Sequence, residues 1–127
     1  MGNSGKQAHD FYADVIEYNK IWTVRNNQEV VIFVSPNERK TLPFWSKISR
    51  IEKIIKNEHS FAKFEIFEVS WDDFQNEWVP KMERNNISVG VNWSGKNLSG
   101  YDMPAKQLVE IVNLNKSALT HHSSGTG

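Results

Sequence analysis

Four histidines and a pair of adjacent aspartates are the residues whose types could support acid–base or metal chemistry. His9, His59 and the pair at 121–122 have neither H-x-x-x-H nor H-x-E spacing, and the chain contains no cysteine to assist them. Asp72 and Asp73 could shift each other's pKa, but adjacent residues of a helix point in different directions. The sequence therefore predicts no catalytic residue, no metal site and no cofactor, and we expect a protein that is not an enzyme.

Aromatic side chains are the better candidates for a binding site. Three of the five tryptophans lie on periodic apolar faces, which is typical of a core: Trp22, Trp71 and Trp78. Trp93 instead ends an expected strand beside a Ser-Gly turn, where an exposed aromatic more often marks binding. The candidate partner- or ligand-binding residues are Trp45, Trp93, Tyr101 and Lys96.

A basic sector on the expected second helix is a further candidate, for phosphate or for an acidic partner. Its members recur every three residues: Lys47, Arg50, Lys53 and Lys56. That spacing drifts around a helix, which favours a solvated face over a recognition stripe. The whole chain balances 15 basic against 15 acidic residues. Because nucleic-acid binders are usually basic, we expect no nucleic-acid partner.

Length and composition favour a single soluble domain. The chain has 127 residues, of which 39% are hydrophobic and 24% charged, and this is enough to bury a core without disulfides. No apolar run approaches the ~20 residues that span a bilayer, and the polar start lacks the apolar core of a signal peptide. We expect a cytoplasmic protein with no membrane partner, which the absence of cysteine also fits.

The first third of the chain predicts a helix and a hairpin. Apolar residues recur at helical spacing from Gly5 to Asn19. Lys20–Arg25 and Glu29–Val34 are rich in β-branched and aromatic residues and flank an Asn-rich turn, which favours a hairpin. Because Val30–Val34 is apolar on both faces, we expect a central strand there. Pro43 cannot donate to a sheet, so its strand is expected at an edge or a bulge.

The middle of the chain predicts two capped helices. Ser46 is expected to cap a helix that reaches Glu58. Ser70 can accept the amide of Asp73 and so begin another helix, whereas Pro80 predicts a kink or an end just before it. Residues 87–92 then alternate apolar and polar side chains, as in a half-buried strand. A short strand at residues 96–101 and a last helix, capped by Asp102 or Met103 and with Pro104 in its first turn, complete the expected elements.

Together these elements predict an α+β fold. We expect a single domain over residues 1–115, with a mainly antiparallel sheet of about five strands covered by about four helices. A doubly wound α/β sheet is less favoured, because no glycine-rich phosphate loop follows a strand. Residues 116–127 form a polar tail without an apolar period and are expected to be disordered.

Several phrases occur together in a fixed order. They are Trp22 in the hairpin, LPFWS at Leu42–Ser46, VSWDDFQNEWVPKMERNNISVGV at Val69–Val91, and Met103-Pro104 followed by Leu108. The chain thereby resembles the bacterial family known as domain of unknown function 2750, over roughly Ala8 to Leu114. That family's pattern has a Leu-Pro-x-Trp segment and a Phe-x-x-x-Trp-x-Pro helix, and this chain departs from it at Arg50, where a small residue is expected.

The resemblance implies a small stand-alone bacterial cytoplasmic protein without an assigned catalytic site, so it carries over no functional residue. Our preferred hypothesis is a non-catalytic module that binds another protein, of the accessory or immunity-like kind, with a homodimer as one form of partner. The alternative is a small-molecule-binding protein or an enzyme that uses a Trp-lined cleft. Single-stranded nucleic-acid binding ranks third, because the net charge is zero.

Overall fold

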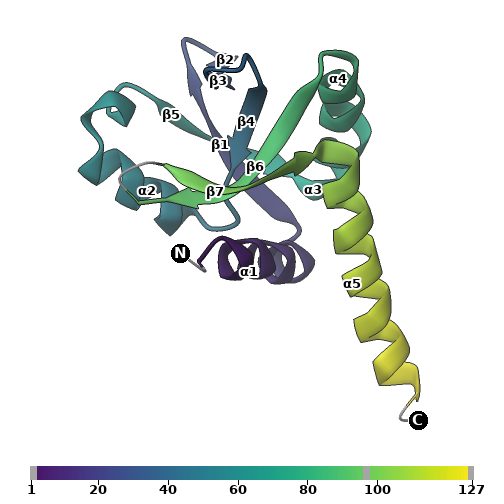
Figure 1. The fold of residues 1–127 in the computed structure, drawn as a ribbon. Helices are drawn as coiled ribbons and strands as arrows, with labels where there is room; N and C mark the ends of the chain where they lie inside the picture. The colour runs from purple at the N-terminus through teal and green to yellow at the C-terminus, as the bar shows by residue number, and fades with distance from the viewer. Residues whose placement is uncertain (1–2, 96–97, 126–127) are drawn as a thin grey trace.

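The computed structural model describes residues 3–95 and 98–125. Its helices and strands follow one another as α1 (Asn3–Tyr18), β1 (Lys20–Asn26), β2 (Glu29–Val30), β3 (Phe33–Val34), β4 (Lys40–Phe44), α2 (Ile48–Asn57), β5 (Glu65–Ser70), α3 (Trp71–Asp73), α4 (Val79–Arg84), β6 (Ile87–Ser94), β7 (Ser99–Pro104) and α5 (Ala105–Gly125). Figure 1 shows these elements around two small sheets in a single α+β domain, as the sequence predicts. The described residues form seven strands where about five were expected.

The first sheet has the order β2-β1-β5 and is antiparallel throughout. The predicted hairpin is confirmed, with Asn26 paired to Glu29 across a two-residue turn. Both turn residues have positive φ, 53° at Asn27 and 70° at Gln28. This left-handed pair is the backbone of a type I′ turn, whose twist matches that of the strands it joins.

The second sheet has the order β3-β4-β6-β7. Its β4–β6 pair is parallel and its other pairs are antiparallel, so the two sheets are mainly antiparallel. The segment Glu29–Val34 does not form the predicted central strand. It divides instead between β2 and β3, and each of these lies at the edge of its sheet. The side chains of this segment still alternate: Val31 and Phe33 pack inward, whereas Val30, Ile32 and Val34 are exposed.

A short backbone contact joins the two sheets. The N–H groups of Trp22 and Trp45 each donate to the other residue's carbonyl at 2.8 Å. Nearby, the buried Thr23 hydroxyl donates to the carbonyl of Pro43 at 2.7 Å. Pro43 lies in β4, an interior strand, so the predicted edge position is wrong. The position tolerates proline because β3 pairs only with Lys40 and Thr41, and no strand needs an N–H from Pro43 on that side.

A continuous helical segment of three parts follows β5. It begins as α3, passes through a π-helical turn at Phe74–Trp78 and continues as α4. In the π turn the N–H of Val79 donates to the carbonyl of Phe74, five residues back. Pro80 has no N–H with which to donate to a carbonyl of the preceding helical turn. The sequence predicts a kink or a helix end at this position, and the structure accommodates the proline with a wider π turn instead.

The start of α3 provides a test of local sequence reasoning. The Ser70 hydroxyl accepts the N–H of Asp73 at 3.0 Å, which confirms the predicted cap. Replacing Ser70 with alanine should lower the free energy of unfolding by about 1 kcal/mol, whereas glycine should cost only a few tenths. Urea denaturation of the two variants measures the difference. Equal losses in both variants would contradict a capping role for the hydroxyl.

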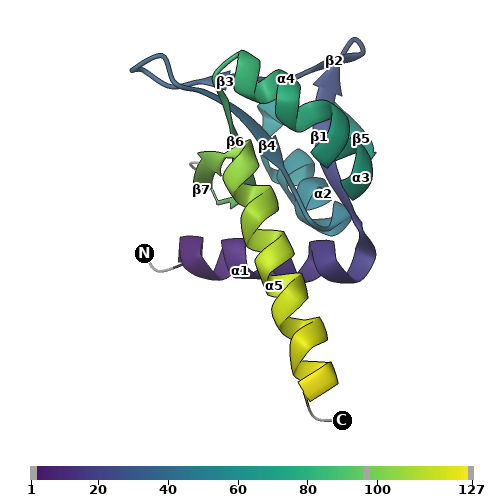
Figure 2. The ribbon, with the colours of Figure 1, turned by 90° about the vertical axis from the view of Figure 1, so that its right-hand side faces the viewer.

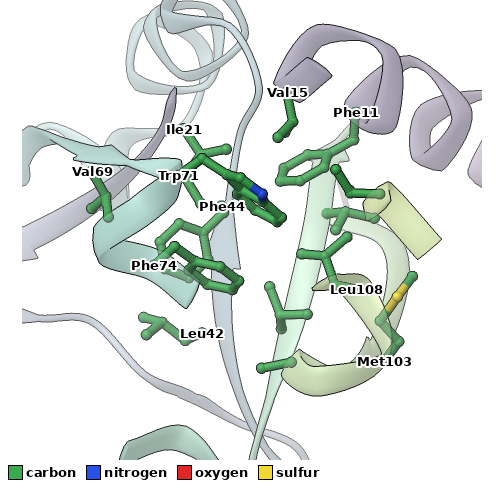
Figure 3. Close-up of a cluster of buried hydrophobic side chains, with 14 of the residues drawn as sticks. Phe11, Val15, Ile21, Leu42, Phe44, Val69, Trp71, Phe74, Met103 and Leu108 are labelled. Atoms are coloured by element: carbon green, nitrogen blue, oxygen red, sulfur yellow. The ribbon is translucent and has the colours of Figure 1, made fainter. Parts of the chain in front are cut away.

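The main core lies between the second sheet and the helices α1, α3 and α5. Figure 3 shows Phe44 and Phe74 in its centre, with Phe11 of α1 and Leu108 of α5 closing it from the other side. The rings of Phe44 and Phe74 meet edge to face at 5.1 Å between centroids. A second apolar cluster, centred on Trp45, Ile51 and Phe61, fills the space beneath α2. The predicted core tryptophans Trp22, Trp71 and Trp78 are buried or packed against these clusters.

The last helix extends further than the sequence predicts. Figure 2 shows α5 crossing α1, and both Figure 1 and Figure 2 show its far end projecting away from the sheets. Its first half supplies Leu108 and Val112 to the core, but the helix continues to Gly125 through residues that we expected to be disordered. No proline and no glycine interrupts the sequence between Ala105 and Ser124, so the chain contains no strong stop signal there.

Candidate functional site

Trp93 is held on the sheet by a strand irregularity. Simple alternation along β6 would place Trp93 on the face of Val89 and Val91, which belong to the main core. Asn92 has a φ of 50°, and the register of the β6–β7 pair shifts between Val91 and Ser94. Trp93 consequently joins the second cluster, beneath α2.

The indole of Trp93 lies over bare backbone. A Cβ atom at Gly90 would stand 2.4 Å from Trp93 Nε1, and a Cβ at Gly100 would stand 2.8 Å from Trp93 Cδ1. The two glycines therefore form a slot for the ring across β6 and β7. The indole N–H donates to Asp102 Oδ1 at 2.8 Å, and only 7% of Trp93 remains exposed.

Trp93 is one of the residues that line a groove of about 400 Å³. The groove runs across the second sheet from β3 to β7, and Phe33, Thr41, Trp93, Gly100 and Asp102 are among its lining residues. The rings of Phe33 and Trp93 meet edge to face, 5.4 Å apart at an interplanar angle of 74°. The groove therefore combines aromatic walls with a carboxylate at its rim, and it is large enough for a ligand of side-chain size.

A group of hydrogen-bonded polar residues, here called the polar seam, lies between β6, α1 and the start of α2. It comprises Gln7, Asp14, Ser46 and Asn92, of which Ser46 and Asn92 are fully buried. Asn92 Oδ1 accepts the N–H of Ser46 at 2.9 Å, and Asn92 Nδ2 donates to the carbonyl of Gln7 at 3.1 Å. The Ser46 hydroxyl donates to Asp14 Oδ2 at 2.7 Å, so Ser46 ties α1 to β6 and does not cap α2 as predicted.

The acids near this seam are engaged with basic side chains. Asp10 accepts from Lys6 at 2.9 Å and from Arg50 at 3.1 Å. The hydrogen bond from Lys6, with the charges of Lys6 and Arg50, holds the pKa of Asp10 below its ordinary value. Because the folded-state pKa is lowered, this contribution to stability is present at neutral pH and is lost as the pH falls through that pKa.

A shallow hollow of about 810 Å³ lies between α2 and the turn after β6. Two members of the basic sector, Arg50 and Lys53, contribute to its lining together with Ser49, Glu58 and Ser94. Arg50 is already paired with Asp10, and Glu58 adds the opposite charge. The hollow therefore has a mixed charge, in keeping with the solvated face that the sequence favours.

Of the four predicted binding residues, the structure brings Trp45 and Trp93 into contact and places Tyr101 on another face of the sheet. Trp45 is fully buried, and its indole donates to the carbonyl of Trp93 at 2.8 Å. Tyr101 pairs with Val91, so its side chain lies on the opposite sheet face from Asp102 and Gly90. Burial raises the pKa of the Tyr12 phenol, and the neighbouring Tyr101 phenol adds to the rise. Lys96 lies outside the described residues.

Comparison with known protein families identifies one family that matches most of the chain. Residues 8–111 match the family described as protein of unknown function, DUF2750. The chain belongs to this family. The match confirms the predicted resemblance, and a comparison with curated proteins finds no match. In this DUF2750 protein the matched span contains the groove, the polar seam except for Gln7, and the main core except for Val112, and it ends within α5.

The sequence does not predict the roles of three residues in the groove and the polar seam. The sequence patterns place Phe33 in a central strand, indicate Asp102 as a helix cap, and make Asn92 one of the polar residues of an alternating strand. The available signal was an asparagine next to a tryptophan, flanked by glycines at 90 and 95, since asparagine and glycine both tolerate the left-handed backbone of a bulge.

Among residues 3–95 and 98–125, no three His, Cys, Asp or Glu side chains gather as a metal site would require. Within the same ranges, no helix combines the length and the hydropathy needed to cross a membrane.

Proposed function

We propose that this DUF2750 protein is a non-catalytic protein-binding module of the bacterial cytoplasm, of the accessory or immunity-like kind. The observation that carries the proposal is an apolar edge formed by Val30, Ile32 and Val34, which point away from the core. Their exposed fractions are 36%, 38% and 61%. These side chains alternate with the inward-facing Val31 and Phe33, so they form one continuous outward row.

The apolar edge lies where a partner strand can reach it. Its flanking strands β2 and β3 are the edges of the two sheets. Edge strands present unpaired N–H and C=O groups, and soluble proteins usually blunt such edges with charges or proline. The apolar edge instead exposes three β-branched residues, which do not discourage another strand from pairing there. It favours a protein partner that adds a strand or lays an apolar surface against this edge.

The acidic side chains support the non-catalytic part of the proposal, because they have structural contacts. Asp10 binds Lys6 and Arg50, and Asp14 accepts the Ser46 hydroxyl. Asp72 and Asp73 are exposed in the first turn of α3, where the helix dipole favours negative charge.

Replacing Ile32 with glutamate should abolish partner capture. A charge in the middle of the apolar edge leaves the core untouched, but it forces a carboxylate into any interface that covers the edge. We expect at least a tenfold loss of affinity, about 1.4 kcal/mol or more. Affinity capture from a bacterial lysate identifies proteins held by the wild type, and titration of the purified partner then compares the two forms. Sedimentation of the chain alone shows whether that partner is a second copy.

A matched control is available on α5, where Leu114 is 69% exposed. The substitution Leu114→Glu introduces the same charge into an exposed apolar site far along the projecting helix. It should leave capture unchanged. Capture that survives Ile32→Glu but is lost in Leu114→Glu would overturn the assignment of the binding surface to the edge.

A further inference from the structure

The groove beside Trp93 presents two kinds of attraction for a cation. Its walls include the rings of Phe33 and Trp93, whose faces carry partial negative charge. Its rim includes Asp102, the one ionisable side chain among the described lining residues. An apolar channel with a single carboxylate suits a ligand that has an apolar stem and a positive end.

Asp102 is positioned for such a ligand by the indole. Asp102 pairs with Gly90 in the β6–β7 register, so it stands on the same sheet face as the groove. One carboxylate oxygen, Oδ1, accepts the Trp93 N–H at 2.8 Å, which fixes the orientation of the group. Asp102 is nevertheless exposed, and a carboxylate offers acceptor sites on both oxygens. The second oxygen can therefore accept from a ligand while the first stays bound to Trp93.

The lining of the groove offers apolar surface for a hydrocarbon stem. Thr41 lines the groove and is 5% exposed, and Gly100 lets the chain approach the indole closely. Phe33 and Leu98 belong to the apolar cluster around Trp93. A hydrocarbon stem can pack against these residues while its charged end stays at the rim.

We propose that this groove binds a primary alkylammonium group, with its stem lying along the Phe33 and Trp93 side chains and its ammonium beside Asp102. The group can belong to a free small amine or to a lysine side chain. The site goes beyond the proposed function. It shares Val34 with the apolar edge, but Ile32, the residue changed to test that edge, is not among the described residues that line the groove. The hollow beside α2 has no comparable arrangement, since its arginine is already paired with Asp10.

The indole N–H of Trp93 provides a direct signal, because it reports on the bond to Asp102. The full chain, labelled with ¹⁵N, is titrated with n-butylammonium while the assigned Trp93 indole resonance is followed. The neutral alcohol n-butanol serves as the matched probe without charge. We expect a saturable shift with n-butylammonium and none with n-butanol. Failure of n-butylammonium to give a saturable shift would overturn the proposal.

Asp102→Asn removes the charge but keeps an oxygen that can accept the Trp93 N–H. The variant should bind n-butylammonium about tenfold more weakly, because a charge-assisted contact is lost. Asp72→Asn removes an exposed charge on α3 and should leave the affinity unchanged. Equal affinity in the wild type and in Asp102→Asn would overturn the assignment to this groove.

A second titration distinguishes the two sources of the ammonium group. The tripeptide Ala-Lys-Ala, blocked at both ends, replaces n-butylammonium. Tighter binding of the tripeptide, again lost in Asp102→Asn, assigns the site to a lysine of a protein. Tighter binding of n-butylammonium assigns it to a free amine. Ile32→Glu should leave both affinities unchanged, so the groove and the apolar edge can fail independently.

Discussion

Replacing Asn92 with alanine should lower the free energy of unfolding by about 4 kcal/mol. The Asn92 amide satisfies the buried N–H of Ser46 and the carbonyl of Gln7, and alanine leaves both without that partner. The unsatisfied N–H of Ser46 costs about 1–3 kcal/mol, and the lost contacts with the Gln7 carbonyl and the Ser46 hydroxyl cost about 1 kcal/mol each. Alanine must also adopt the φ of 50° that Asn92 has, which adds about 1 kcal/mol.

Two further variants separate these contributions. Asn92→Gly loses the same hydrogen bonds but relieves the left-handed strain, so it should be about 1 kcal/mol more stable than Asn92→Ala. Asn86→Ala is the matched control, because Asn86 has a φ of 55° but an exposed side chain. It should cost only the strain, about 1 kcal/mol. Urea denaturation gives all three values, and equal losses at positions 92 and 86 would contradict a stabilising role for the polar seam.

The sequence was most informative where one local rule decides the structure. Asparagine at positions 26 and 27 predicted the hairpin turn, and Ser70 with Asp73 predicted the start of α3. Both depend on the conformational preferences of a few neighbouring residues, so no tertiary contact was needed. The α+β class followed from the same level of reasoning, because it depends on the order of elements more than on their pairing.

The predictions that failed are those that depend on which strands pair with each other. Val30–Val34 has the composition of a buried strand, but its position at two sheet edges is set by which strands β1 and β4 accept beside it. Pro43 is tolerated inside a sheet because β3 stops two residues before it. Strand order is a property of the assembled fold, and a single sequence read locally does not contain it.

The candidate site was partly predictable for the same reason. The sequence predicts Trp93 to be an exposed binding residue, whereas the structure buries it. One left-handed residue, Asn92, moves Trp93 to the opposite sheet face, and only there does it meet Phe33 and Asp102. Alternation is a strong rule within a regular strand, yet a bulge shifts the phase of every residue after it. Prediction of the groove would have required the bulge first.

Replacing Gly90 with alanine should lower the free energy of unfolding by about 3 kcal/mol. The added methyl group would lie 2.4 Å from Trp93 Nε1 and 2.5 Å from Trp93 Cε2, well inside van der Waals contact. The ring cannot move toward β7, because Gly100 already lies close to it there. Relief therefore requires the indole to leave its slot and give up the 2.8 Å bond to Asp102. Urea denaturation measures the loss, and the Trp93 indole resonance should shift at the same time.

A glycine-to-alanine substitution at another position should raise the free energy of unfolding. Gly5 lies in α1 with nothing within 4 Å of an added Cβ, so Gly5→Ala should stabilise the chain by about 0.5–1 kcal/mol through helix propensity. A double-mutant cycle then assigns the cost at Gly90 to the indole. In a Trp93→Leu background, Gly90→Ala should cost less than about 1 kcal/mol, because the smaller side chain leaves room for the methyl group. An undiminished cost in that background would mean that the backbone of β6, and not the ring, requires glycine.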